Sequence, residues 1–319
     1  LTAIDEKNEK PSFLATTPGL LLACLGACLL WGSAFPCVKI GYGLFGISSS
    51  DVATIIAFAG ARFLISGALV VVAMSLVRRR PYVPARADWA PAVKLSVFQT
   101  TLQYLLFYVG LSRSAGVTSS IIEASNAFFI VLLAVYAFRT ERMTWRKAAG
   151  CLVGFAGVLL VNLGGGGAGA HFSLTGEGLV FLSTISAAVS SNLAKRYSTE
   201  HDPVLLSGWQ FVIGGAMLLA AGLAMGGRIA PADAANPLPA VALLVYLGFI
   251  SAAAYSLWSM ALAANPVSRV AVFGFMNPVF GAVLSALLLG ETSVVSPVLA
   301  VVALALVSTG IVVVNRGEK

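Results

Sequence analysis

The stretch YLLFYVGLSRSAGVTSSIIEASNAFF, from Tyr104 to Phe129, aligns without a gap on YSLWSMALAANPVSRVAVFGFMNPVF, from Tyr255 to Phe280, at an offset of 151 residues. A second pair, RFLISGAL from Arg62 and QFVIGGAM from Gln210, aligns at an offset of 148. Similarity at a nearly constant offset indicates two copies of one structural unit. The chain is therefore a duplication, and its fold follows from what one copy contains.

Composition identifies the kind of unit. Hydrophobic residues make up 58% of the chain and charged residues 10%, with a mean hydropathy of +0.91, so the chain cannot cover itself with polar surface. At about 1.5 Å per residue, roughly 20 apolar residues cross about 30 Å of hydrocarbon as a helix. Ten segments are long enough: 19–40, 52–77, 91–112, 115–138, 145–163, 175–195, 204–226, 238–262, 266–289 and 294–315. They predict an all-α polytopic membrane protein with ten transmembrane helices.

Five helices per copy is an odd number, so the second copy must enter the membrane from the opposite side. The prediction is an inverted repeat with a pseudo-two-fold axis in the membrane plane, the plan that permits alternating access. We expect a cytoplasmic tail at 1–18, a first five-helix repeat at 19–163, an external Gly-rich linker at 164–174, a second repeat at 175–315 and a cytoplasmic tail at 316–319.

Basic residues set the expected orientation. When loops alternate between the two sides, sixteen of the twenty Lys and Arg residues fall on the side of the N-terminus, and Lys39, Arg113 and Arg228 on the other. This asymmetry predicts both termini in the cytoplasm, in a bacterial-type inner membrane. The net charge of +7 is thus a topology signal, and we expect no nucleic-acid partner. No cleavable signal peptide is expected, because residues 1–18 are polar.

Further features follow the duplicated plan. They are LLWGSAFPCVKIG in the first helix (Leu29–Gly41), Glu141 and Glu291 after the fourth and ninth helices, and the small-residue segments GCLVGFAGVLLVN and ALALVSTGIVVVN in the fifth and tenth. In this order they resemble the drug/metabolite transporter superfamily, specifically its EamA-type members, from about residue 19 to 315.

This resemblance implies a central cavity lined by helices one to four and six to nine, with helices five and ten peripheral. It implies alternating access to small metabolites, often as export, and names no substrate. One departure is that Asn277-Pro278 in the second copy stands where the first has Asn126-Ala127.

Two ionisable residues are expected inside the membrane, where charge is expensive and tends to mark function. Arg62 lies 11 residues from Asp51 at the outer end of its helix, about 16 Å deep. Glu123 lies 8 residues from the outer end of its helix, about 12 Å deep. We predict a gated ion pair, with Arg62 meeting an anionic substrate group and Glu123 a cation or proton; a static structural pair is the alternative.

Polar and aromatic side chains at comparable depths suit a cavity for a partly apolar, hydrogen-bonding solute. The candidate binding residues, besides Arg62 and Glu123, are Trp31, Ser33, Gln99, Gln103, Tyr104, Tyr108, Asn126, Ser190, Asn192, Gln210, Tyr255, Trp258 and Asn277. Pro36 and Pro278 are candidate gating kinks, because proline frees a backbone carbonyl. For each polar residue, hydrogen bonding between helices is the competing interpretation.

Several function classes are disfavoured. His171 and His201 are the two histidines and lie in different loops, and no catalytic, cofactor or metal-ligand cluster is visible, so we expect no enzyme. The four cysteines fall in apolar runs and predict neither a disulfide nor a metal site. We expect a secondary or facilitative carrier, favouring efflux of amino acids or related compounds; uptake, and a channel or lipid-moving scaffold, are the alternatives.

The fifth helix carries a close-packing face of three glycines, Gly150, Gly154 and Gly157. This face is expected to pack within one protomer or in a homodimer.

Overall fold

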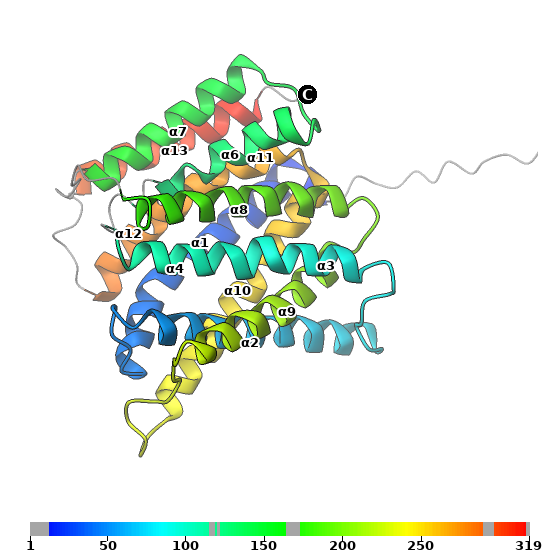
Figure 1. Ribbon diagram of the computed structural model, residues 1–319. Helices are drawn as coiled ribbons and strands as arrows, with labels where there is room; N and C mark the ends of the chain where they lie inside the picture. Colours follow the sequence, from blue (N-terminus) through cyan, green and yellow to red (C-terminus); the bar gives the residue numbers. More distant parts are fainter. Residues whose placement is uncertain (1–12, 115–118, 120–121, 164–172, 290–296, 317–319) are drawn as a thin grey trace, which may run out of the picture.

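A computed structural model describes residues 13–114, 119, 122–163, 173–289 and 297–316, and all regular structure within them is helical (Figure 1). The first copy contains η1 (Phe13–Ala15), α1 (Thr17–Leu44), α2 (Val52–Arg78), α3 (Trp89–Leu95), η2 (Ser96–Leu102), α4 (Gln103–Leu111), α6 (Asn126–Leu132), η3 (Leu133–Ala137) and α7 (Trp145–Leu163). The second contains α8 (Glu177–Tyr197), α9 (Pro203–Ala224), α10 (Leu238–Ala264), α11 (Val267–Ala271), η4 (Val272–Phe275), α12 (Met276–Leu289) and α13 (Pro297–Asn315).

Within the described residues, each of the ten predicted segments overlaps one of these helices or a consecutive run of them. By length and composition, five helical stretches of the described chain could each cross a membrane: Thr17–Leu44, Val52–Arg78, Pro203–Ala224, Leu238–Ala264 and Val267–Ser285. Helix starts follow from capping. The Asp51 carboxylate accepts from the Thr54 amide, and Asp202 caps α9 with Pro203 in its first turn. The expected Gly-rich linker lies mostly outside the described residues, as does Glu291.

Helices α2 and α9, which are repeat counterparts, pack against each other in antiparallel fashion. A Cβ atom on Gly60 would meet the backbone of Leu219, and one on Gly67 the backbone of Val212. As residue numbers rise along α2 they fall along α9, so the two helices run in opposite directions. Close backbone approach through glycine lets two helices associate without a water-driven hydrophobic force.

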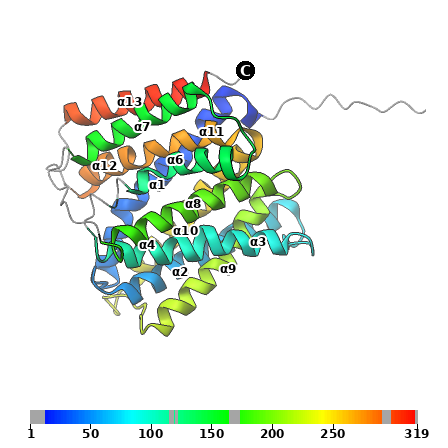
Figure 2. The same cartoon turned by 45° about the horizontal axis from the view of Figure 1, so that its top comes forward.

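Helices α7 and α13 repeat this arrangement at one edge of the bundle, side by side in both views (Figures 1 and 2). A Cβ on Gly150 would touch Val314, and one on Gly157 would touch the backbone of Ala303. The glycine face of the fifth helix therefore packs within the chain. Because counterpart helices are antiparallel at both seams, the copies are related by an inverting two-fold axis, and the predicted inverted repeat is confirmed.

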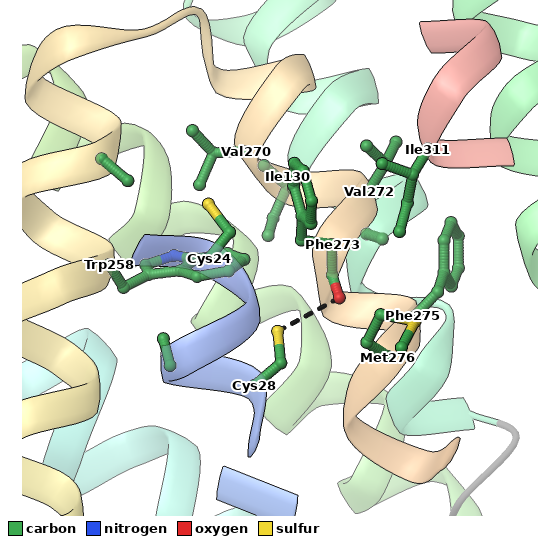
Figure 3. Close-up of a cluster of buried hydrophobic side chains, with 14 of the residues drawn as sticks. Cys24, Cys28, Ile130, Trp258, Val270, Val272, Phe273, Phe275, Met276 and Ile311 are labelled. Atoms are coloured by element: carbon green, nitrogen blue, oxygen red, sulfur yellow. Dashed lines mark hydrogen bonds between the residues drawn. The ribbon is translucent and has the colours of Figure 1, made fainter. Parts of the chain in front are cut away.

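The largest core cluster lies between α1 and the broken ninth segment (Figure 3). The Cys28 thiol donates to the carbonyl oxygen of Phe273 at 3.2 Å. All four cysteines are free and buried, as small apolar residues are expected to be. Three helical turns within longer segments depart from regular α geometry: η2 and η3 are π-helical, and η4 is a 3₁₀ turn. Such irregular turns often occur at functional sites.

Candidate functional site

Four aromatic rings meet at the centre of the duplicated fold. Phe63 and Phe211 stack with centroids 5.2 Å apart and an interplanar angle of 4°. Tyr104 packs on Phe63 at 4.5 Å, and Tyr255 packs on Phe211 at 4.9 Å. The Tyr104 and Tyr255 hydroxyls are 3.0 Å apart and share a hydrogen bond. We call these four residues the aromatic quartet.

The quartet consists of two repeat-related pairs, at offsets of 148 for the phenylalanines and 151 for the tyrosines. A residue that touches its own counterpart lies next to the two-fold axis. Because this axis relates the two ends of the bundle, it passes midway between them. The quartet therefore lies at mid-depth, where a carrier with an inverted repeat binds its solute.

Arg62 borders the quartet from α2. Its side chain is 7% exposed, and its guanidinium carbon lies 4.4 Å from the centre of the Phe63 ring and 5.9 Å from that of Tyr104. Its buried Nε has no hydrogen-bond partner among the described residues. A ring face stabilises a cation only modestly, so the guanidinium remains available to an anionic group.

The counterpart of Arg62 is the fully buried Gln210. Its Oε1 accepts a 2.6 Å hydrogen bond from Thr100, whereas its Nε2 lacks a partner within the described chain. The duplicated position thus carries a charge in one copy and an amide in the other. The two halves of the centre are similar in shape but differ in charge.

The predicted ion pair between Arg62 and Glu123 is not formed in this structure. No nitrogen–oxygen contact within 4.0 Å joins them in the described chain. The guanidinium instead lies over Phe63. Arg62 therefore borders the aromatic quartet from α2 without an ion pair to Glu123.

An aromatic wall continues from the quartet onto α1. Trp31 meets Tyr255 and Trp258 edge-on, at 4.9 and 5.2 Å between centroids. Its buried Nε1 has no acceptor among the described residues. Tyr108 lies 6.0 Å from Tyr104 on the same helix. Sequence inspection singled out these residues but missed Phe63 and Phe211, although both stand at matched positions of the aligned RFLISGAL and QFVIGGAM.

Two asparagines at an offset of 151 also carry unsatisfied buried polar atoms. Asn126 and Asn277 are half-buried, and in each the Oδ1 atom is buried with no donor in the described chain. Each lies next to a helix interruption: α6 begins at Asn126 after a turn at Ser125, and Asn277 follows η4. Unsatisfied carbonyl oxygens of this kind are acceptors for a solute that donates hydrogen bonds.

Other predicted residues are placed differently. The hydroxyls of Ser33 and Ser190 donate to carbonyls in their own helices, at 2.8 Å each. Asn192 donates to Ile130 at 3.1 Å and so connects α8 to α6. The Asn192 contact joins two helices, which is the competing interpretation, whereas the two serine hydroxyls are satisfied within their own helices. Pro36 is buried within α1, while Pro278 is the third residue of α12, directly after η4.

The two glutamines of the third segment lie close along one helix turn. Gln99 is buried and belongs to the π-helical η2, whereas Gln103 begins α4 and is half-buried. The two glutamines differ in burial and lie on either side of the boundary between the π-helical turn and α4.

Comparison with known proteins gives consistent matches along the chain. The sequence model of the EamA-like transporter family matches residues 17–163 and again 174–316. A probable terminal-alkyne amino-acid exporter of Streptantibioticus cattleyicolor is 30% identical over 90% of both chains. A probable amino-acid metabolite efflux pump of Salmonella typhimurium is 27% identical over 83% of this chain and 85% of its own. One crystal structure, 18% identical, superimposes with a TM-score of 0.74 over 95% of this chain and 100% of that one.

Proposed function

Because the chain belongs to the EamA-like transporter family, we propose that it is a secondary or facilitative carrier that exports amino acids or related small metabolites by alternating access. The predicted family resemblance is confirmed, and with it a role in membrane transport. The proposal concerns the solute, the direction and the mechanism. One observation carries it: a buried arginine without an ionic partner in the described chain borders an aromatic cluster on the two-fold axis.

The chemistry of this centre suits an amphipathic solute with an anionic group. The Arg62 guanidinium can bind a carboxylate through two parallel hydrogen bonds. The Glu123 carboxylate, with the free Oδ1 atoms of Asn126 and Asn277, can accept hydrogen bonds from an amino group. The rings of Trp31 and the quartet provide apolar surface for a side chain. An α-amino acid has these three parts.

The symmetry suggests how the site changes access. In alternating access, each copy adopts the conformation that the other had before. A contact between a residue and its own repeat counterpart is the same in both states and therefore persists. Contacts of α1 with α10 and of α8 with α4 are instead mapped onto each other. The quartet and the α2–α9 seam are then the fixed parts of the cycle, around which the other helices move.

Direction is inferred from two sources. The end of the bundle with more basic loops is expected to face the cytoplasm. The names of the two relatives describe export and efflux. The same mechanism operates inward if the gradients reverse, so uptake is the alternative outcome of a transport assay.

A counterflow assay in liposomes tests the proposal. Radiolabelled phenylalanine, leucine, glutamate and lysine serve as separate probes, and we expect saturable counterflow with at least one of them. Arg62→Gln should reduce it by about tenfold or more, because a buried charge-assisted hydrogen bond contributes about 1.5–3 kcal/mol. Arg80→Gln, in the exposed loop after α2, is the matched control and should transport normally. Normal counterflow by Arg62→Gln would refute the site.

Glu123→Gln tests coupling to protons. If Glu123 exchanges a proton during the cycle, the variant should transport with a flattened pH dependence, because glutamine does not titrate. An unchanged pH profile would exclude that role and leave facilitated diffusion or exchange.

A further inference from the structure

A cavity of about 510 Å³ lies away from the aromatic centre, and none of the residues assigned to that centre lines it. Three segments form its wall: the approach to α7, the end of α8 and the link between α10 and α11. The lining residues are Thr140, Glu141, Arg142, Thr144, Lys147, Lys195, Ala264, Asn265, Pro266 and Val267. Both copies of the repeat contribute, and the volume is within the range of small-molecule sites.

The single carboxylate in this wall is already occupied. Glu141 accepts a 2.6 Å hydrogen bond from the Lys147 ammonium on one oxygen and a 3.1 Å hydrogen bond from the Ser268 amide on the other. The Glu141 and Lys147 side chains are only 8% and 5% exposed. Burial by itself raises the pKa of Glu141, but the hydrogen bonds from Lys147 and Ser268 outweigh it and lower the pKa below its ordinary value.

Lys195 brings a second ammonium into the wall. Its Nζ donates to the carbonyl of Ala263 at 3.2 Å, and this is its one hydrogen bond within the described chain. An ammonium has three donors, so two are left for another partner. Arg142, exposed at the rim, adds a third positive charge. The lining therefore holds three cations against one carboxylate, which is already held by Lys147 and the Ser268 amide.

We propose that this cavity is a binding site for an oxyanion, a carboxylate or phosphate group, held by Lys195 and Arg142. The Thr144 hydroxyl lines the same wall and accepts from the Lys147 amide at 3.3 Å, so its own hydrogen can be donated to the anion; the Thr140 hydroxyl already donates to the Ala134 carbonyl. A phosphate can come from a soluble ion or from the headgroup of an anionic lipid, and the chemistry of recognition is the same. The proposal does not depend on which solute the central site transports.

Calorimetric titration of the protein in phosphatidylcholine nanodiscs tests this site. Inorganic phosphate and succinate are the probes, at constant ionic strength maintained with chloride so that screening does not vary. We expect saturable binding of at least one probe. Lys195→Gln should weaken it about tenfold or more, since a hydrogen bond to a charged group contributes about 1.5–3 kcal/mol.

The neighbouring Arg196, which is exposed and absent from the cavity lining, provides the matched control. Arg196→Gln should bind as the parent does. Arg142→Gln, at the exposed rim, should also weaken binding and is less able to disturb folding than a change at Lys195. Absence of saturable binding by the parent would overturn the proposal. So would parental affinity in both Lys195→Gln and Arg142→Gln.

Nanodiscs that contain phosphatidylglycerol distinguish the two sources of the anion. If the headgroup occupies the site, the parent should bind soluble phosphate more weakly in these nanodiscs than in phosphatidylcholine nanodiscs. The affinity of Lys195→Gln should then be the same in both lipids. If the natural ligand is a soluble anion, the affinity should be the same in both lipids. Either result supports the site and identifies its occupant.

Discussion

Even one added methyl group at Gly60 should destabilise the α2–α9 seam. A Cβ at this position would lie 2.2 Å from the Leu219 nitrogen and 2.6 Å from its Cα. Ordinary van der Waals contact begins at 3.4 Å, so the atoms must separate by about 1.2 Å. Because both atoms belong to backbone, no rotamer change relieves the clash, and α2 and α9 must move apart along their contact.

The cost of Gly60→Ala follows from two opposing terms. Overpacking costs about 1–3 kcal/mol, and we take the upper end because backbone meets backbone. Alanine in place of glycine returns about 1 kcal/mol of helix propensity. We therefore expect a net loss of about 2 kcal/mol, or a fall in Tm of about 4 °C at roughly 2 °C per kcal/mol for a long chain.

Gly43→Ala is the matched control. Gly43 also lies in a transmembrane helix, α1, but a Cβ there meets nothing within 4 Å. Its substitution should leave Tm unchanged or raise it slightly. The four buried cysteines make the assay direct, since a thiol-reactive fluorescent dye reports their exposure as detergent-solubilised protein is heated. If Gly60→Ala and Gly43→Ala have the same Tm, the seam is not close-packed and the prediction is wrong.

Two further predictions concern other contacts. Replacing Tyr104 and Tyr255 by phenylalanine, singly and together, should reveal a coupling of about 0.5–1.5 kcal/mol in unfolding free energy, because one hydroxyl–hydroxyl bond joins them; additive effects would contradict that bond. Glu141→Gln should destabilise by about 3 kcal/mol at pH 7 by breaking a buried pair. Because the folded pKa of Glu141 is lowered from 4.5, the parent's advantage should be constant down to about pH 4.5 and shrink below it; a gap that widens in acid would contradict this assignment.

Much of the fold could be predicted from the sequence, because long apolar runs and a repeat at constant offset are one-dimensional signals. The predicted segments agree with the observed helices to within a few residues at most ends. The π turn in the third segment could not be predicted, because Ser96–Leu102 has no proline or glycine to mark it. The inverted arrangement could be predicted because each copy has five membrane-spanning segments, an odd number, so the second copy enters the membrane from the opposite side.

The candidate site was harder to predict for a physical reason. Residue counting gave Arg62 and Glu123 compatible depths, but depth says nothing about the direction in which a side chain leaves its helix. The structure turns the guanidinium onto Phe63 instead. Likewise, Asn192 reaches across to α6 because that helix lies beside α8. The stacking of Phe63 on Phe211 requires knowledge that counterpart helices touch, which follows only from their packing.

The glycine contacts between α2 and α9 also bear on the origin of the chain. Gly60 and Gly67 have counterparts in Gly208 and Gly215. Equivalent surfaces of the two copies therefore pack against each other. This is the geometry of an antiparallel homodimer. A half-length ancestor that inserted in both orientations would already possess the seam, and gene fusion would then free each half to diverge. Arginine at 62 and glutamine at 210 differ at one repeat position, which two identical halves could not do.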